Sequence, residues 1–169
     1  MERSATGRSR LRRWLLPAIL VLPASVDSRV DPDGRGASRL DWGAYQQVEF
    51  VTADGLSGTF RVRVADTKEK RALGLMFNPR LPLNEGMLFV FDSEQHIAMY
   101  MRNTLIPLDM WFLRRNGEVS KVHHSATQLD PRHIHSESPA IGVLEINAGL
   151  SRLLGVTPGT VVRHPTLSR

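Results

Sequence analysis

The dipeptide Asn116-Gly117 is the feature that most constrains how this chain folds. Asn-Gly is the strongest short-range signal for a hairpin, in which a turn joins two antiparallel strands. An apolar run at residues 108–113 precedes it, and residues 118–123 alternate polar and apolar side chains after it. A lone hairpin is barely stable in water, so its apolar face needs further strands. The sequence therefore predicts a sheet.

Other segments have the same character. Residues 48–51 and 59–65 alternate at period 2 around Asp54-Gly55 and Ser57-Gly58, which predicts a second hairpin. Four more short runs are expected to be strands, at residues 87–91, 97–101, 140–146 and 160–163.

Two short helices are expected between the strands. The first covers residues 68–77, with Asp66 or Thr67 as its N-cap and Asn78-Pro79 as its end. The second covers residues 148–154, with Asn147 as its N-cap. Because strands and helices do not alternate, we expect a mainly β (α+β) fold, a compact antiparallel β-sandwich or barrel-like domain with two short helices.

Basic residues are concentrated at the N-terminus. The whole chain has 22 Lys and Arg against 17 Asp and Glu, but residues 1–25 hold five arginines and one glutamate. Residues 26–169 are thus nearly neutral, and no nucleic-acid partner is expected. The absence of cysteine excludes disulfides, thiol nucleophiles and cysteine-based metal sites.

Residues 1–25 have the order of a secretory signal peptide: an arginine-rich start, nine mostly apolar residues and a small-residue exit. The apolar run is much shorter than the roughly 20 residues of a spanning helix, so no permanent membrane span is expected if the signal is cleaved. Residues 26–46 are predicted to be a flexible linker, and residues 47–165 a single domain. The predicted location is periplasmic or extracellular. An uncleaved membrane tether and a basic tail on a cytoplasmic protein remain alternatives.

The segment 101–109 is the best candidate for a binding site. It contains Met101, and Asn103 and Thr104 place an amide and a hydroxyl at a strand end. Asp109 interrupts an apolar run, so its carboxylate must be hydrogen-bonded, be paired with a cation or have a functional role. Locking the local hairpin by hydrogen bonds is the structural alternative for Asp109.

Glu145 is a second carboxylate within an apolar strand. If its strand neighbours that of Asp109, the two could converge, with one pKa raised for acid–base work. A salt bridge from Glu145 to Arg71 or Arg102 is the competing interpretation. Arg71 could also clamp an anionic group of a ligand with its planar guanidinium.

Four histidines lie close together in the sequence, at positions 123, 124, 133 and 135. His133 and His135 share one side of an extended segment, and His123 could join them on Zn²⁺ or Cu²⁺. Exposed loop histidines are the simpler interpretation, because no catalytic metal signature accompanies them. No cofactor is expected.

Four blocks in the chain resemble the family catalogued as domain of unknown function 192. They are Val64-Ala-Asp-Thr-Lys-Glu-Lys-Arg-Ala-Leu-Gly-Leu-Met76, Glu85-Gly-Met-Leu-Phe-Val-Phe91, Met101-Arg-Asn-Thr-Leu-Ile-Pro-Leu-Asp109 and Val143-Leu-Glu-Ile-Asn-Ala-Gly149. The resemblance spans residues 48–164 and implies a compact β-rich domain, often preceded by a signal peptide, with no established activity. Some relatives carry a cysteine pair in the segment matching residues 128–138, which this chain lacks.

Three functions are therefore considered. The leading hypothesis is a non-catalytic, exported domain that binds a small ligand or an envelope component near Asn103, Asp109 and Glu145. The alternatives are an acid–base hydrolase of envelope material that uses Asp109 and Glu145, and a metal-binding protein that uses histidines.

Overall fold

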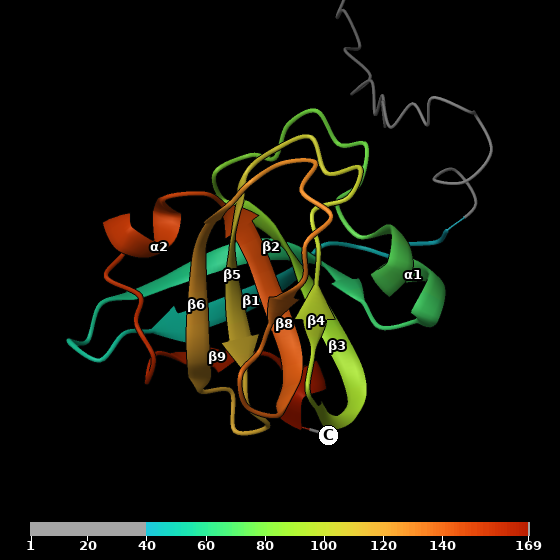
Figure 1. Cartoon of the computed structure of the whole chain (residues 1–169). Helices are drawn as coiled ribbons and strands as arrows, with labels where there is room; N and C mark the ends of the chain where they lie inside the picture. Colours follow the sequence, from blue (N-terminus) through green and yellow to red (C-terminus); the bar gives the residue numbers. More distant parts are fainter. Residues whose placement is uncertain (1–39, 169) are drawn as a thin grey trace, which may run out of the picture.

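A computed structural model describes residues 40–168 of the chain. Its strands and helices follow one another in the order β1 (Gln46–Val51), β2 (Ser57–Ala65), α1 (Lys68–Leu73), β3 (Glu85–Gln95), β4 (Ala98–Met99), β5 (Leu108–Leu113), β6 (Val119–Ala126), β7 (Ile134–His135), β8 (Ala140–Asn147), α2 (Leu150–Leu153), β9 (Val161–Arg163) and the 3₁₀ helix η2 (Pro165–Ser168). The predicted fold class, mostly β with two short helices, is confirmed (Figure 1).

Seven strands form one sheet in the order β6-β5-β8-β3-β2-β1-β9, and β4 pairs with β7 in a separate ribbon. All pairs in the large sheet are antiparallel except β2–β3, which is parallel. A parallel pair needs a crossover connection, and α1 lies in that connection. The helix is therefore placed beside the sheet rather than at a hairpin tip.

The sheet curls into a half-barrel. Trp111 of β5 packs edge-on against Phe50 of β1 at a ring-centroid distance of 5.5 Å, although three strands separate β5 from β1 in the sheet. The bridge between Glu118 and Val161 brings the start of β6 against β9. Because the sheet curls, side chains on its inner face pack against one another and are buried.

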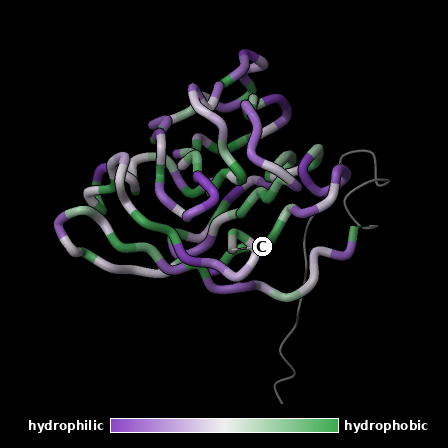
Figure 2. The backbone as a smooth tube through the Cα atoms, turned by 90° about the horizontal axis from the view of Figure 1, so that it is seen from below, coloured by the Kyte–Doolittle hydropathy of each residue, from purple (hydrophilic) through white to green (hydrophobic). Residues whose placement is uncertain are grey.

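Hydrophobic side chains fill both faces of the curled sheet. The inner core contains Trp111, Phe60 and Leu144, and the outer core contains Met110, Phe89 and Val143. Figure 2 shows hydrophobic stretches in the interior of the backbone trace and many of the most hydrophilic residues at its outer bends. Strands β5 and β8 are consequently buried on both faces, which matters for the two acidic residues they carry.

Local signals predicted several element ends correctly. Both expected hairpins form, at β1–β2 and β5–β6, and Thr67 caps α1 by accepting a hydrogen bond from the Lys70 N–H at 3.2 Å. The helix ends at Leu73, earlier than expected, because Gly74 has a φ of 50°. A Cβ at Gly74 would lie 3.0 Å from the Phe89 ring, so glycine also lets this turn approach the sheet.

Two expectations about the ends of the domain need correction. Asn147 does not cap α2: its side-chain amide donates to the Leu81 and Pro82 carbonyls instead, and Gly149 occupies the N-cap. Trp42, inside the segment predicted as linker, is buried in the outer core. Trp42 therefore packs with the folded domain although it lies before residue 47. The predicted signal segment lies outside the described residues.

Candidate functional site

Asp109 points into the inner core from β5 and is fully buried. One carboxylate oxygen accepts a hydrogen bond from the Ser125 N–H at 2.8 Å, and the other accepts from the Ser151 N–H at 2.9 Å. The indole N–H of Trp111 donates to the Ser151 hydroxyl at 2.7 Å. Asp109 therefore joins β5 to β6 and to the first turn of α2.

A β-bulge explains how the Ser125 N–H reaches this carboxylate. Leu108 pairs with Ala126 and Met110 with His123, so β6 holds one residue more than β5 across this step. Ser125 has a φ of 53°, which turns its N–H out of the ladder toward Asp109. Burial pushes the pKa of Asp109 upward, but the hydrogen bonds from Ser125 and Ser151 outweigh it and hold that pKa below its ordinary value.

Glu145 points into the outer core from β8. It pairs in register with Met110 of β5 and Met87 of β3, and its exposed fraction is 4%. Among residues 40–168 its carboxyl group has no hydrogen-bond or ion-pair partner. Burial raises the pKa of Glu145 to about 8. A carboxyl group with this pKa is largely protonated at neutral pH.

The two acidic residues are not brought together. Asp109 pairs in register with Ile146, and Glu145 pairs with Met110, so the two carboxyl groups leave opposite faces of the sheet. Their strands are neighbours, as the acid–base hypothesis required, but the register is displaced by one residue. The predicted convergence of Asp109 and Glu145 is therefore wrong, and with it the hydrolase geometry. The predicted salt bridge from Glu145 to Arg71 or Arg102 is also absent from the described part of the chain.

Glu145 lines a cavity of about 210 Å³, which we call the Glu145 pocket. Its walls come from α1 and the following turn, β3, β4 and the turn after it, and they consist of Arg71, Ala72, Leu73, Gly74, Leu75, Met76, Phe89, Phe91, Ala98, Met99, Tyr100 and Thr104. Most of the lining residues are thus apolar or aromatic, and a buried carboxyl group and one cationic side chain accompany them, a combination found in small-molecule sites.

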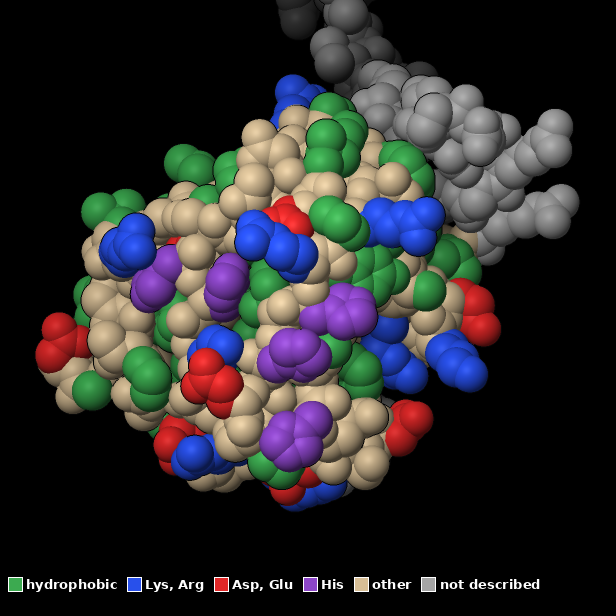
Figure 3. Space-filling view, viewed as in Figure 1, with side chains coloured by type: hydrophobic (Ala, Val, Ile, Leu, Met, Phe, Trp, Pro, Cys, Tyr) green, Lys and Arg blue, Asp and Glu red, His purple; other side chains and the backbone are tan. Residues whose placement is uncertain are grey.

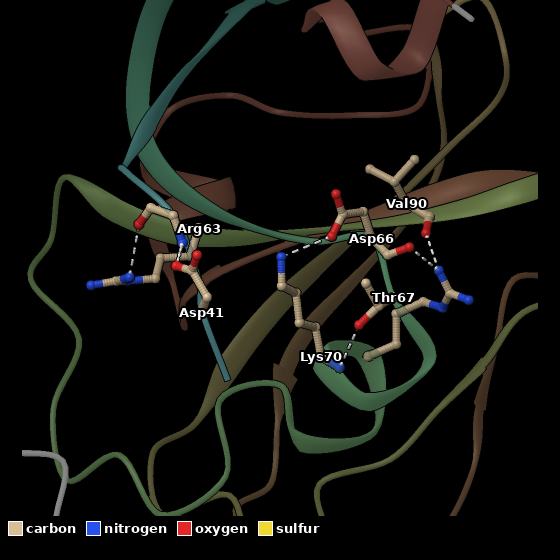
Figure 4. A network of polar contacts seen from close by, with 8 residues as sticks. Asp41, Arg63, Asp66, Thr67, Lys70 and Val90 are labelled. Carbon is tan, nitrogen blue, oxygen red and sulfur yellow. Dashed lines mark hydrogen bonds and ion pairs between the residues drawn. The ribbon is translucent and has the colours of Figure 1, made fainter. Parts of the chain in front are cut away.

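Arg71 is held in place by backbone carbonyls. Its Nη1 donates to the Val90 carbonyl at 2.7 Å and to the Asp66 carbonyl at 3.0 Å, and its guanidinium lies 5.0 Å from the centre of the Phe91 ring. Figure 4 shows Asp66 and Val90 close together at the start of α1, where Lys70 also contacts the Asp66 carboxylate. Arg71 therefore borders the Glu145 pocket, as its prediction as a ligand-binding residue requires, in a fixed position.

The predicted binding residues Met101, Asn103 and Thr104 lie in one loop but do not line the same cavity. Thr104 is buried and lines the Glu145 pocket, whereas Met101 is buried and lines a second cavity. Asn103 is exposed with a φ of 58°, and its carbonyl accepts a hydrogen bond from the Phe77 N–H at 2.9 Å. Asn103 thus shapes the turn after α1, and of the three only Thr104 borders the same pocket as Glu145.

Histidines gather on one face of the molecule (Figure 3). His123, His124 and His133 line a cavity of about 430 Å³, the histidine pocket, and the rings of His133 and His135 lie 5.9 Å apart. Burial, and after it the charge of Lys121, lowers the pKa of His123. Within residues 40–168 no three His, Asp or Glu side chains gather closely enough to hold a metal ion. Of the predicted set, His133 lies beside His135 and shares the histidine pocket with His123.

The aromatic walls of the Glu145 pocket were not among the predicted site residues. Residues 87–91 of β3 are a continuous apolar run, a pattern that predicts a strand buried on both faces but does not show which side chains line a cavity. The proximity of these aromatic walls to Glu145 follows from the pairing of β3 with β8, in which Met87 faces Glu145 and Phe89 faces Val143. No signal within residues 87–91 alone identifies that partner strand.

Comparison with known proteins gives a family and a fold. A protein-family model described as DUF192, Uncharacterized ACR, COG1430, matches residues 49–164. A crystal structure from Sinorhizobium meliloti 1021, described as a "putative transcription regulator", is 34% identical with a TM-score of 0.69, covering 72% of this chain and 95% of that one. A protein of unknown function from Novosphingobium aromaticivorans DSM 12444 is also 34% identical with a TM-score of 0.69, covering 71% and 85%. The search of the curated proteins found no match.

Proposed function

The chain belongs to the DUF192 family, and on that premise we propose that its folded domain binds a small ligand in the Glu145 pocket without transforming it. The observation that carries the proposal is the Glu145 carboxyl group, which is buried and has no partner among residues 40–168. Burying an unpaired carboxyl group destabilises a fold, whereas an apolar residue of similar size would not. A bound ligand supplies the missing partner.

The surroundings of Glu145 support a binding role over a structural one. A structural carboxylate accepts hydrogen bonds at both oxygens, as Asp109 does. Glu145 instead borders a cavity with aromatic and thioether walls, and Arg71 is fixed beside it. The described lining of the pocket offers one acidic group and no second acid, which favours recognition over acid–base hydrolysis.

A fragment screen on the full chain tests this function. We expect at least one small polar fragment to bind, with the largest amide shifts in nuclear magnetic resonance at Gly74, Leu75 and Phe89. Glu145→Gln is expected to weaken that binding at least tenfold, because it changes the only acidic group among the described residues that line the pocket. Glu49→Gln, which alters an exposed residue of β1, is the matched control and should bind normally. Shifts confined to other surfaces, equal in both variants, would contradict the proposal.

We also propose that the domain acts after export, with residues 1–25 as a cleaved signal. The support is the basic, apolar and small-residue order of that segment. Among residues 40–168 no helix is long and apolar enough to cross a membrane.

N-terminal sequencing of the protein from fractionated cells tests the export proposal. A start close to residue 25 in the exported fraction is the expected result. A start at Met1 in the membrane fraction would indicate an uncleaved tether, and a start at Met1 in the cytoplasm would overturn export altogether.

A further inference from the structure

The Glu145 pocket combines a buried acid with three aromatic rings. Phe89, Phe91 and Tyr100 line it together with the thioethers of Met76 and Met99. Aromatic faces carry partial negative charge and attract cations, most strongly where water is excluded. Sulfur adds polarizable contact surface. These walls are suited to a positively charged group that is also bulky and weakly hydrated.

The contact between Arg71 and Phe91 is an example of a cation on an aromatic wall of the pocket. The Arg71 guanidinium lies over the Phe91 ring at 5.0 Å from the centroid, so one aromatic wall already contacts a cation. Arg71 does not neutralise Glu145, because the two form no ion pair and Nη1 of Arg71 is bound to the Asp66 and Val90 carbonyls. The acid therefore lacks a counter-ion from the described residues.

The size of the pocket limits what it accepts. Its volume of about 210 Å³ lies below the range of about 300–1,000 Å³ typical of drug-sized ligands. A small charged headgroup fits this space, whereas an extended ligand would have to leave most of its length outside. Tyr100, with an exposed fraction of 38%, marks a solvent-accessible part of the lining.

We propose that the Glu145 pocket binds the cationic head of an organic amine, a protonated or methylated ammonium group, with Glu145 as its counter-ion. This inference rests on the proposed binding function and names the ligand class. The ammonium group contacts the aromatic rings on its flanks and the carboxylate at its centre. A neutral group of the same shape gains only the apolar contacts.

The charge of Glu145 makes the inference dependent on pH in a defined direction. Burial raises the pKa of Glu145 to about 8, so the carboxylate that an ammonium group needs becomes more populated as pH rises toward 8. Affinity for a permanently charged ammonium should therefore increase by up to about tenfold per pH unit below 8, with release of one proton on binding. A ligand that accepts a hydrogen bond from the protonated carboxyl group shows the opposite slope.

Choline and 3,3-dimethylbutan-1-ol form a matched pair of probes, because carbon replaces the charged nitrogen in the alcohol. We expect calorimetry on the full chain to show choline binding at least tenfold more tightly at pH 8 than at pH 6. The alcohol should bind more weakly than choline at pH 8, and its affinity should not increase with pH. Glu145→Gln should remove both the tighter binding of choline and its pH dependence, while Glu49→Gln should retain them.

A second variant separates recognition from folding. Tyr100→Leu changes a partly exposed ring and should weaken choline several-fold while leaving the alcohol nearly unaffected. Equal binding of choline and the alcohol, or a choline affinity that falls with pH, would overturn the ammonium inference. Binding of the alcohol or of a carboxylate that depends on Glu145, without choline binding, would overturn it but leave the proposed function standing. Binding of no probe or fragment at the pocket would overturn both.

Discussion

Replacing Asp109 with alanine is expected to lower the free energy of unfolding by about 3–5 kcal/mol at pH 7. The substitution leaves the N–H of buried Ser151 and the partly buried N–H of Ser125 without their acceptor, and it opens a cavity beside Trp111. Each buried, unpaired donor costs about 1–3 kcal/mol. Urea denaturation followed by Trp fluorescence measures the change.

The dependence on acid follows from the same contacts. Because hydrogen bonding holds the folded-state pKa of Asp109 below its unfolded value, the carboxylate stabilises the fold fully above the unfolded pKa of about 3.9. That contribution is lost as pH falls through the folded pKa. Asp109→Ala should therefore unfold with less dependence on pH below about 4 than the unaltered chain.

Asp92→Ala is a suitable control for Asp109→Ala. Asp92 is exposed on β3, so its replacement should change the free energy of unfolding by less than about 0.5 kcal/mol. A loss below about 1 kcal/mol for Asp109→Ala would contradict the role of this carboxylate as the junction of β5, β6 and α2.

Glu145→Met is expected to have the opposite effect and stabilise the fold at neutral and alkaline pH. Methionine is close to glutamate in length and suits the apolar surroundings of Met110 and Met87. Burial raises the pKa of Glu145 from its ordinary value of 4.5 to about 8, so the folded state binds this proton more tightly than the unfolded state. Stability contributed by the protonated group is complete below the unfolded pKa and is lost as pH rises toward 8.

The expected loss of stability follows from the raised pKa of Glu145. Between pH 5 and 8 the unaltered chain should lose up to about 1.4 kcal/mol of stability per pH unit through Glu145, or roughly 3–5 kcal/mol in total. Glu145→Met should lack this loss, so the two chains should differ most at pH 8 and least near pH 4.5. Denaturation curves at several pH values measure the difference.

Glu145→Gln is the control that isolates charge from polarity. It should lack the pH dependence but retain the cost of a buried polar group, and so fall between the other two chains at pH 8. Parallel stability profiles for Glu145→Met and the unaltered chain would show that the carboxyl group is hydrated or paired in solution. A stabilising replacement at Glu145 that removes ligand binding is the trade-off expected of a residue retained for function.

Local chemistry explains which parts of the fold were predictable. Asn116-Gly117 and the Thr67 cap act over a few residues, so their effects can be predicted from the sequence around them. The α1 end was predicted too late because Gly74, not Pro79, stops the helix, in a turn that packs against Phe89. The Asn147 cap was wrong because its amide finds carbonyl partners at residues 81 and 82, more than sixty positions away.

The candidate site was only partly predictable for a related reason. Glu145 and Asp109 stood out because each is an acid within an apolar strand, and both are buried. Strands buried on both faces lack a clear apolar and polar alternation, so β5 and β8 do not reveal which faces meet. A displacement of one residue in their register decides whether two side chains share a face.

By itself the sequence determined the family, the β-rich class, the hairpin turns and the two acids that had to be accounted for. These features depend on short-range backbone preferences and on side-chain polarity, which are properties of the residues themselves and do not require knowledge of distant contacts. Only the tertiary structure decided that β8 lies between β5 and β3, and that Asp109 is hydrogen-bonded at both oxygens on the inner face. It also decided that Glu145 lies on the outer face without a partner among residues 40–168. Those outcomes depend on register between distant strands, where the free energy of packing two whole faces selects one alignment.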